Sequence, residues 1–202
     1  MAKQQMNTNT YKLVLSALMV ALSTILCMIE VYQLPMGGGI TLFGQVPVVV
    51  VSWLFGIPWG LAAGLAMSLI QMLFGLSNFA YVSGPVAYTV LVLADYILPF
   101  TLLGLGGMFK KSIKNSNLAI GLGAFVVSVI RFLCHFISGI TIWASFASEQ
   151  TVGAILAYSA TYNGSYMVGE TILTVLGCVL LNQFLFPRLD ENGLPKSGKK
   201  AA

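Results

Sequence analysis

Two polar side chains stand close together in an otherwise apolar segment of the sequence. Arg131 and His135 are four residues apart, so on a helix they lie on one face. Only 8% of the residues are charged, and a cation inside a membrane helix is costly unless it faces a cavity or a partner group. Gly139 and Trp143 continue the spacing of four. The segment predicts a helix face directed into a small-molecule site, with Gly139 leaving room for a flat ligand.

A carboxylate interrupts a second apolar segment. Asp95 would be expensive to bury without a partner, and its candidate partners are Arg131, His135 or a cationic ligand. An Asp95–Arg131 ion pair would join two helices and could also position the carboxylate beside a ligand. Glu170 could pair with Arg131, line the cavity or cap a polar network, whereas Glu30 is expected to be a solvated carboxylate at the membrane interface.

Aromatic and amide side chains add chemistry suited to a flat or cationic ligand. Trp143, Tyr81 and Tyr158 could stack on a heteroaromatic ring or attract a cation, worth about 0.5 to 2 kcal/mol each. Asn163 could offer both a donor and an acceptor to a ring edge. We therefore expect a binding site for a small organic molecule rather than a metal or cofactor site.

Several other functions find no support in the sequence. No G-x-x-x-x-G-K-[ST] loop is present, so transport driven by ATP would need another subunit. Cys27, Cys134 and Cys178 lie in apolar stretches without the spacing of metal ligands, and are expected to be reduced thiols. The net charge of +4 follows from membrane topology, and no nucleic-acid partner is inferred.

Composition defines the elements that must position these residues. The 202 residues are 57% hydrophobic, and apolar stretches recur along almost the whole chain, which predicts an all-α integral membrane protein. The first stretch, from Leu13 to Ile29, is too long for the core of a signal peptide and is expected to be a retained helix. Since a crossing needs about 20 residues, we expect six transmembrane helices at residues 11–31, 45–56, 59–75, 86–109, 117–142 and 164–186.

The basic residues predict the orientation, because Lys and Arg collect in cytoplasmic loops. With both termini cytoplasmic, the segments placed outside (32–44, 76–85 and 143–163) contain no Lys or Arg. The chain then consists of a cytoplasmic tail (1–10), a membrane domain (11–187) and a second cytoplasmic tail (188–202). The polar and aromatic candidates gather on the outer side, which favours uptake over export. The basic residues assigned to the cytoplasmic side are Lys3, Lys12, Lys110, Lys111, Lys114, Arg188, Lys196, Lys199 and Lys200.

Together these motifs resemble the thiamine-specific S component, the substrate-binding membrane subunit, of energy-coupling factor (ECF) transporters. The most specific part is the series from His135 to Asn163. The first helix also carries Ala17 and Ala21, a small-x-x-x-small face that permits close approach of another helix. The matching segments are Leu34–Leu42 before Pro47, Tyr81–Pro85, Ala94–Tyr96, Arg131–Gly139 with Trp143, and Tyr158–Gly164.

The resemblance implies a six-helix subunit in the plasma membrane of a prokaryote, associated with a transmembrane coupling subunit and two ATPase subunits. It implies that Ala17 and Ala21 contact a partner subunit. It further implies that Arg131 positions the carboxylate of Asp95. In the first external loop some relatives have a tryptophan and a glutamate where Gly38 and Leu42 stand here, so that part of the pocket must differ. The implied thiamine-binding residues are Asp95, Tyr96, His135, Gly139, Trp143, Tyr158, Asn163 and Tyr81.

Three other interpretations stay open on the sequence alone. The ligand could be another vitamin or precursor, such as riboflavin, biotin or a thiamine fragment. The chain could be a membrane enzyme with His135 and Asp95 as acid and base, although no nucleophile or metal cluster accompanies them. It could also be a proton-coupled secondary transporter that uses Asp95, His135 and Glu170 as a relay, although the two halves of the sequence show no inverted repeat.

Overall fold

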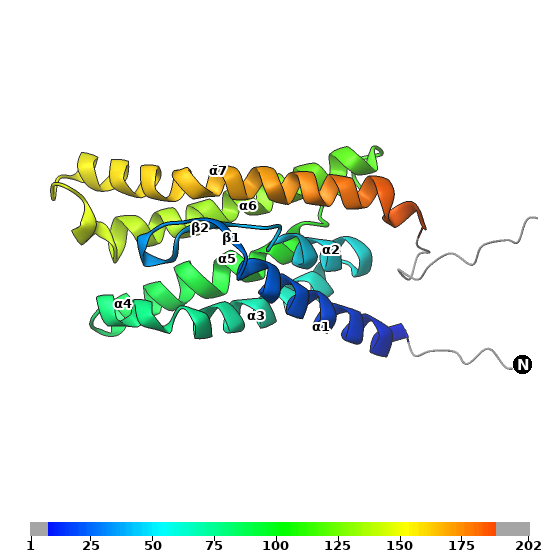
Figure 1. The fold of residues 1–202 in the computed structure, drawn as a ribbon, viewed down its shortest axis with the longest axis horizontal. Helices are drawn as coiled ribbons and strands as arrows, with labels where there is room; N and C mark the ends of the chain where they lie inside the picture. Colours follow the sequence, from blue (N-terminus) through cyan, green and yellow to red (C-terminus); the bar gives the residue numbers. More distant parts are fainter. Residues whose placement is uncertain (1–7, 189–202) are drawn as a thin grey trace, which may run out of the picture.

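The computed structural model describes residues 8–188 and is a bundle of helices that share one long axis (Figure 1). The N-terminal end of α1 and the C-terminal end of α7 lie at the same end of the bundle. The predicted tails, residues 1–10 and 188–202, fall outside the described residues apart from 8–10, in α1, and Arg188. The α-helices are α1 (Thr8–Cys27), α2 (Val46–Phe55), α3 (Ile57–Phe74), α4 (Pro85–Val90), α5 (Leu98–Thr101), α6 (Ser116–Thr141) and α7 (Val152–Phe184).

Five segments of the described chain are long and apolar enough to cross a membrane, which supports the all-helical membrane fold. The long helices expose large apolar side chains such as Leu18 and Phe184 on their outward faces, as expected for contact with lipid. The second predicted span, residues 45–56, corresponds to α2, which has only ten residues and is not among these five segments. Its side chains from Val46 to Trp53 are buried among other helices. The five segments are Asn9–Cys27, Ile57–Phe74, Pro85–Leu105, Ser116–Thr141 and Val152–Phe184.

A sharp reversal separates α2 from α3. Gly56 has φ +94°, a conformation that side chains strongly disfavour, and it ends α2. Pro58 then occupies the first turn of α3, where backbone N–H groups have no acceptor within the helix, so the missing N–H of proline costs no hydrogen bond. The predicted boundary at Gly56-Ile-Pro58 is thus explained by backbone chemistry.

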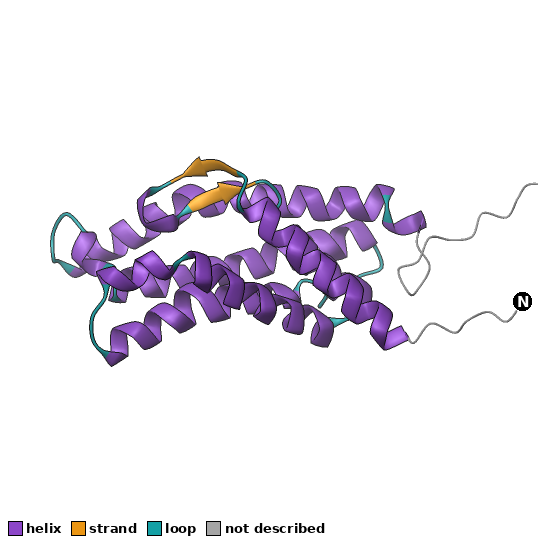
Figure 2. Cartoon of the chain, turned by 60° about the horizontal axis from the view of Figure 1, so that its bottom comes forward, coloured by secondary structure: helices purple, strands orange, loops and turns teal. Residues whose placement is uncertain are grey.

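The segment between α1 and α2, which the sequence predicts to be an external loop, contains a β-hairpin (Figure 2). Strands β1 (Glu30–Gln33) and β2 (Gly39–Thr41) pair antiparallel, with Glu30 opposite Thr41 and Gln33 opposite Gly39. The first helix therefore ends at Cys27 rather than at residue 31, because the β-branched and aromatic side chains that follow favour a strand. At the turn, Met36 adopts a left-handed conformation with φ 67°.

The fourth predicted span, residues 86–109, is not a uniform α-helix. Between α4 and α5 the chain forms a π-helical stretch, Leu91–Ile97, in which the amide of Leu98 bonds to the carbonyl of Leu93, five residues back. Pro99 has no N–H to offer the carbonyl of Asp95 and would clash with it in a regular helix. Such π-helical turns are frequent at functional sites, and this one contains Asp95. Helical structure continues to Leu105 and then gives way to turns.

The last helix begins earlier than predicted. It was expected at residues 164–186, but α7 begins at Val152, and the Thr151 hydroxyl caps it by accepting a 3.2 Å hydrogen bond from the amide of Ala154. Because the residues from Tyr158 to Asn163 are polar, hydropathy alone places the start of the helix after them. Both residues therefore lie on a helix and not in a loop.

Candidate functional site

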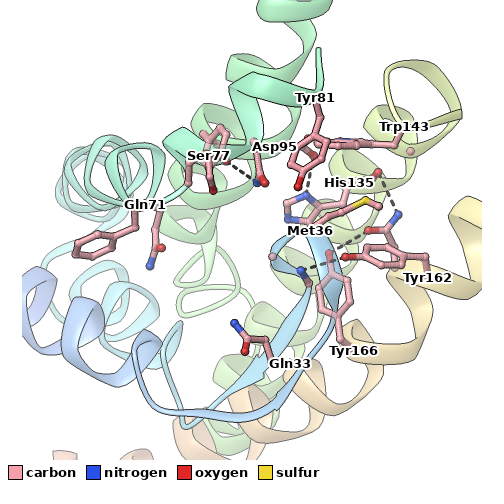
Figure 3. Close-up of a pocket in the computed structure, with 18 of the residues that line it drawn as sticks. Gln33, Met36, Gln71, Ser77, Tyr81, Asp95, His135, Trp143, Tyr162 and Tyr166 are labelled. Carbon is pink, nitrogen blue, oxygen red and sulfur yellow. Dashed lines mark hydrogen bonds and ion pairs between the residues drawn. The ribbon is translucent and has the colours of Figure 1, made fainter. Parts of the chain in front are cut away.

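A cavity of about 430 Å³ lies between the hairpin, α3, the π-helical stretch, α6 and α7 (Figure 3). Its volume is in the range typical of sites for small organic molecules. The structure brings all the predicted pocket residues and Arg131 to this one cavity, although they come from different elements. They are Tyr81, Asp95, Tyr96, Arg131, His135, Gly139, Trp143, Tyr158 and Asn163.

Asp95 is the most extensively bonded acidic group of the cavity wall. Its carboxylate lies 3.1 Å from His135 Nδ1 and accepts hydrogen bonds from Ser138 Oγ at 2.6 Å and Trp143 Nε1 at 2.9 Å. All three partners belong to α6 or to the residues that follow it. A carboxylate held by three donors keeps a fixed position.

The predicted ion pair between Asp95 and Arg131 is wrong. Arg131 NH1 lies 3.5 Å from Glu170 Oε1 of α7, and its guanidinium stacks 4.8 Å above the ring of Phe100. The reason is the position of each group along α6: Asp95 meets the turns that carry His135 and Ser138, whereas Arg131 is one turn further from the C-terminal end of the helix. The alternative in which Glu170 pairs with Arg131 is confirmed.

His135 has one ring nitrogen committed and one available. A carboxylate can only accept, so Nδ1 carries the proton in the bond to Asp95. With that proton on Nδ1, a neutral imidazole has Nε2 as an acceptor. Among the described residues His135 Nε2 is buried without a hydrogen-bond partner, as is Arg131 Nε. Buried polar atoms are normally partnered, so these two atoms are suited to contact a molecule in the cavity.

The buried charges of the cavity do not cancel. Arg131 and Glu170 neutralise each other, and His135 needs no charge to bond to Asp95. Asp95, whose side chain is part-buried, therefore leaves an uncompensated negative charge in the cavity. Glu30, exposed on β1, also lines the cavity and adds a carboxylate at its rim. This net negative charge favours binding of a cationic ligand.

Aromatic rings line the cavity in two groups, and Figure 3 shows Tyr81 with Trp143 and Tyr162 with Tyr166. In one group Trp143 lies against Tyr81, with ring centroids 6.1 Å apart and a 53° tilt, and the side chain of Tyr81 is exposed. In the other group Tyr158 and Tyr162 stack at 5.9 Å, and Tyr162 meets the edge of Tyr166 at 6.0 Å. Two groups of aromatic rings suit a flat, positively charged ring system.

Gly139 and Asn163 have structural duties that the sequence did not reveal. A Cβ on Gly139 would collide with Ser159 Oγ and lie 3.2 Å from Asn163 Nδ2, so this glycine lets α6 approach α7 closely. The space expected there for a ligand is filled by α7. Asn163 Nδ2 donates to the carbonyls of His135 and Ser159, and its Oδ1 accepts from Tyr166. Asn163 therefore fixes the aromatic side of the cavity.

Several cavity residues were not predicted. Tyr162 and Tyr166 follow Tyr158 at intervals of four, a helical stripe that is visible once α7 is known to begin at Val152. Ser138 does not line the cavity but donates to Asp95, and its position three residues after His135 places it on the same helix face. Gln33 and Met36 of the hairpin carried no such signal. Asn78, which donates to the hydroxyl of Tyr96 at 3.0 Å, also carried none.

A multi-pass helical membrane protein with an anionic, aromatic-lined cavity belongs to the class of small-molecule transport proteins. A family model described as thiamine transporter protein matches residues 13–188. The chain belongs to this family. The family consists of transport proteins, so the membrane-enzyme interpretation of Asp95 and His135 is set aside.

Individual relatives agree with the family match. The thiamine transporter ThiT of Bacillus subtilis (strain 168) is 30% identical over 181 residues, which cover 84% of this chain and 89% of that protein. The solved structure of ThiT from Listeria monocytogenes is similar with a TM-score of 0.72 and 22% identity, and the match covers 94% of this chain and 100% of the other. At that identity the structural match demonstrates the shared fold.

Proposed function

We propose that this protein is the thiamine-binding S component of an ECF-type uptake transporter. The observation that carries the proposal is the uncompensated carboxylate of Asp95, deep in a cavity lined by two groups of aromatic rings. Thiamine joins a permanently cationic thiazolium ring to a flat aminopyrimidine, so its charge and shape complement that cavity. Membership of the thiamine transporter protein family supports the same ligand.

The geometry suggests a role for each group. Asp95 supplies charge complementarity to the thiazolium ring, and Trp143 with the tyrosines stacks on the rings. His135 offers Nε2 as an acceptor, which suits the exocyclic amine of the aminopyrimidine. Gly139 and Asn163 hold α6 and α7 at the separation that the cavity requires.

Membrane topology follows from the same proposal. Six spans with both termini cytoplasmic would place the cavity at the outer side, in the plasma membrane of a prokaryote. The positions of α1 and α7, whose terminal ends lie at one end of the bundle, support an even number of crossings (Figure 1). Transport would then require a coupling subunit and two ATPase subunits, because the chain contains no nucleotide-binding loop.

Calorimetric titration of the purified protein tests the ligand. Thiamine is expected to bind saturably at micromolar concentration or below, whereas riboflavin and biotin are expected to give no heat of binding. Binding of either of those vitamins without thiamine binding would reject the assignment and favour the S component of another vitamin.

The partner contact on α1 gives a separate prediction. Ala17 and Ala21 are both exposed on the outer face of α1, where a partner helix could approach. We expect that Ala17→Trp combined with Ala21→Trp abolishes copurification with the coupling subunit, because the large rings prevent close helix packing. Thiamine affinity should stay unchanged, since neither residue lines the cavity.

The matched control is Ala62→Trp combined with Ala66→Trp. These two residues are also exposed and four apart, but on α3. The control should copurify with the coupling subunit normally. Equal loss of copurification in both double variants would show that α1 has no special contact.

A proton-driven secondary transporter remains the alternative from another class. Its relay would need Glu170 to communicate with His135, but in the described structure Glu170 bonds to Arg131 and Thr41 instead. Vesicles that contain only this subunit are therefore expected to show no thiamine uptake in a proton gradient. Uptake under those conditions would favour the secondary transporter.

A further inference from the structure

The hairpin forms one wall of the cavity and is joined to α7 at two places. Residues of β1 and of the turn, including Gln33, Met36 and Gly38, line the cavity. At the first place the hydroxyl of Tyr162 accepts from the amide of Gly38 at 3.2 Å and donates to the carbonyl of Pro35. Tyr162 itself lines the cavity, so this contact belongs to the site already described.

The second place is two turns further along α7. Glu170 Oε2 accepts from the backbone amide of Thr41 at 2.8 Å, and Oε1 accepts from the Thr41 hydroxyl at 2.7 Å. Bonds to an ionised acceptor are stronger and more directional than neutral ones. Because Thr41 pairs with Glu30 across the hairpin, a fixed Thr41 also fixes the end of β1.

Glu170 is placed to act without touching the ligand. Its side chain is 2% exposed, and neither Glu170 nor Thr41 lines the cavity. Arg131, 3.5 Å away, compensates the buried charge, which would otherwise be strongly unfavourable. The carboxylate is thus held in place and oriented toward Thr41 of β2.

The turn of the hairpin needs external support. Met36, at its tip, has a left-handed backbone with φ 67° and ψ 19°, which non-glycine residues adopt only where surrounding contacts maintain it. Hydrogen bonds with α7 provide such support on either side of the turn, at Pro35, Gly38 and Thr41.

We infer that Glu170, compensated by Arg131, is a positioning residue for ligand binding: it holds Thr41 so that the hairpin wall stays closed against α7 and slows release of the bound molecule. The inference rests on the proposed function only in naming thiamine as that molecule. It gives a role in ligand binding to Glu170, although Glu170 does not line the cavity.

Replacement of the Thr41 side chain tests the inference without disturbing the ion pair. In Thr41→Val the hydroxyl bond to Glu170 is lost, and thiamine dissociation is expected to be about tenfold faster, with the association rate changed less than about threefold. Thr41→Ser retains a hydroxyl and should restore slow dissociation. Thr171→Val is the matched control, because the Thr171 hydroxyl donates within α7 to the carbonyl of Met167.

A second variant and a cycle separate positioning from folding. Glu170→Gln should change dissociation in the same direction, and the Thr41→Val and Glu170→Gln effects should be less than additive because both remove one contact. Since Glu170→Gln also leaves Arg131 without its counter-ion and can prevent folding, Thr41→Val is the primary test. A lower melting temperature with an unchanged dissociation rate in Thr41→Val would overturn the inference.

Hydrogen exchange of the ligand-free protein gives a readout that does not depend on thiamine. Amides of residues 30–41 are expected to exchange faster in Thr41→Val than in Thr171→Val, and equal rates would overturn the inference. If the unaltered protein bound no thiamine, the proposed function would fail, and the exchange measurement would still decide whether Glu170 holds the hairpin.

Discussion

An Asp95→Asn variant is expected to bind thiamine at least about 100-fold more weakly, equivalent to about 2.7 kcal/mol. The substitution removes the uncompensated, part-buried negative charge of the cavity. It also replaces one acceptor oxygen by an NH2 group, which would face a donor in either orientation: His135 Nδ1–H on one side, or Ser138 and Trp143 on the other. Calorimetric titration of the purified variant measures the loss.

Two further variants control this prediction. Glu149→Gln removes an exposed carboxylate from the segment between α6 and α7 that does not line the cavity, and should leave the affinity unchanged. Asp95→Glu keeps the charge and should lose less affinity than Asp95→Asn. An Asp95→Asn variant that binds thiamine within about threefold of the unaltered protein would remove Asp95 from the site.

The largest effect on stability is expected for Arg131→Met. Removal of one partner from a buried ion pair typically destabilises by about 3 to 5 kcal/mol, because Glu170 would keep its charge without a counter-ion. For a chain of this size the melting temperature should fall by about 10 °C. Thermal unfolding in detergent, followed by circular dichroism, provides the measurement.

The double variant Arg131→Met with Glu170→Gln is the informative comparison for that prediction. It removes both charges and should recover part of the lost stability. Lys111→Met removes an exposed cation in the loop before α6 and should leave the melting temperature nearly unchanged. A melting temperature for Arg131→Met equal to that of Lys111→Met would contradict the importance of the buried pair.

Features carried by one helix could be predicted well from the sequence. The segment from Arg131 to Trp143 was expected within a helix at residues 117–142, and α6 spans Ser116–Thr141. A spacing of four on a single helix determines which side chains share a face, so its arrangement needed no knowledge of other elements. Because polar groups in an apolar chain are expected to face a cavity, these residues predicted a binding site. All the predicted ligand-binding residues, and Arg131, line the cavity.

Features that depend on how the helices are positioned relative to one another could not be predicted. Asp95 could equally have met Arg131 or His135, and the π-helical stretch together with helix packing decides the outcome. The extent of α7 was missed because its first turns are polar on one side. The hairpin is also a product of tertiary contacts, since its short strands are held by Tyr162 and Glu170 of a distant helix.

The length of α7 has a consequence for how a cation reaches the site. Its 33 residues make a rod of about 50 Å, while the hydrocarbon layer is only about 30 Å thick, or about 20 helical residues. In the proposed orientation, that layer extends from Phe184 back to about residue 165. Tyr158 and Asn163 then stand at the depth of the lipid head groups. A charged vitamin could therefore bind from water without entering the hydrocarbon layer. The tyrosine rings that contact it would lie at the membrane–water interface, where aromatic residues are common.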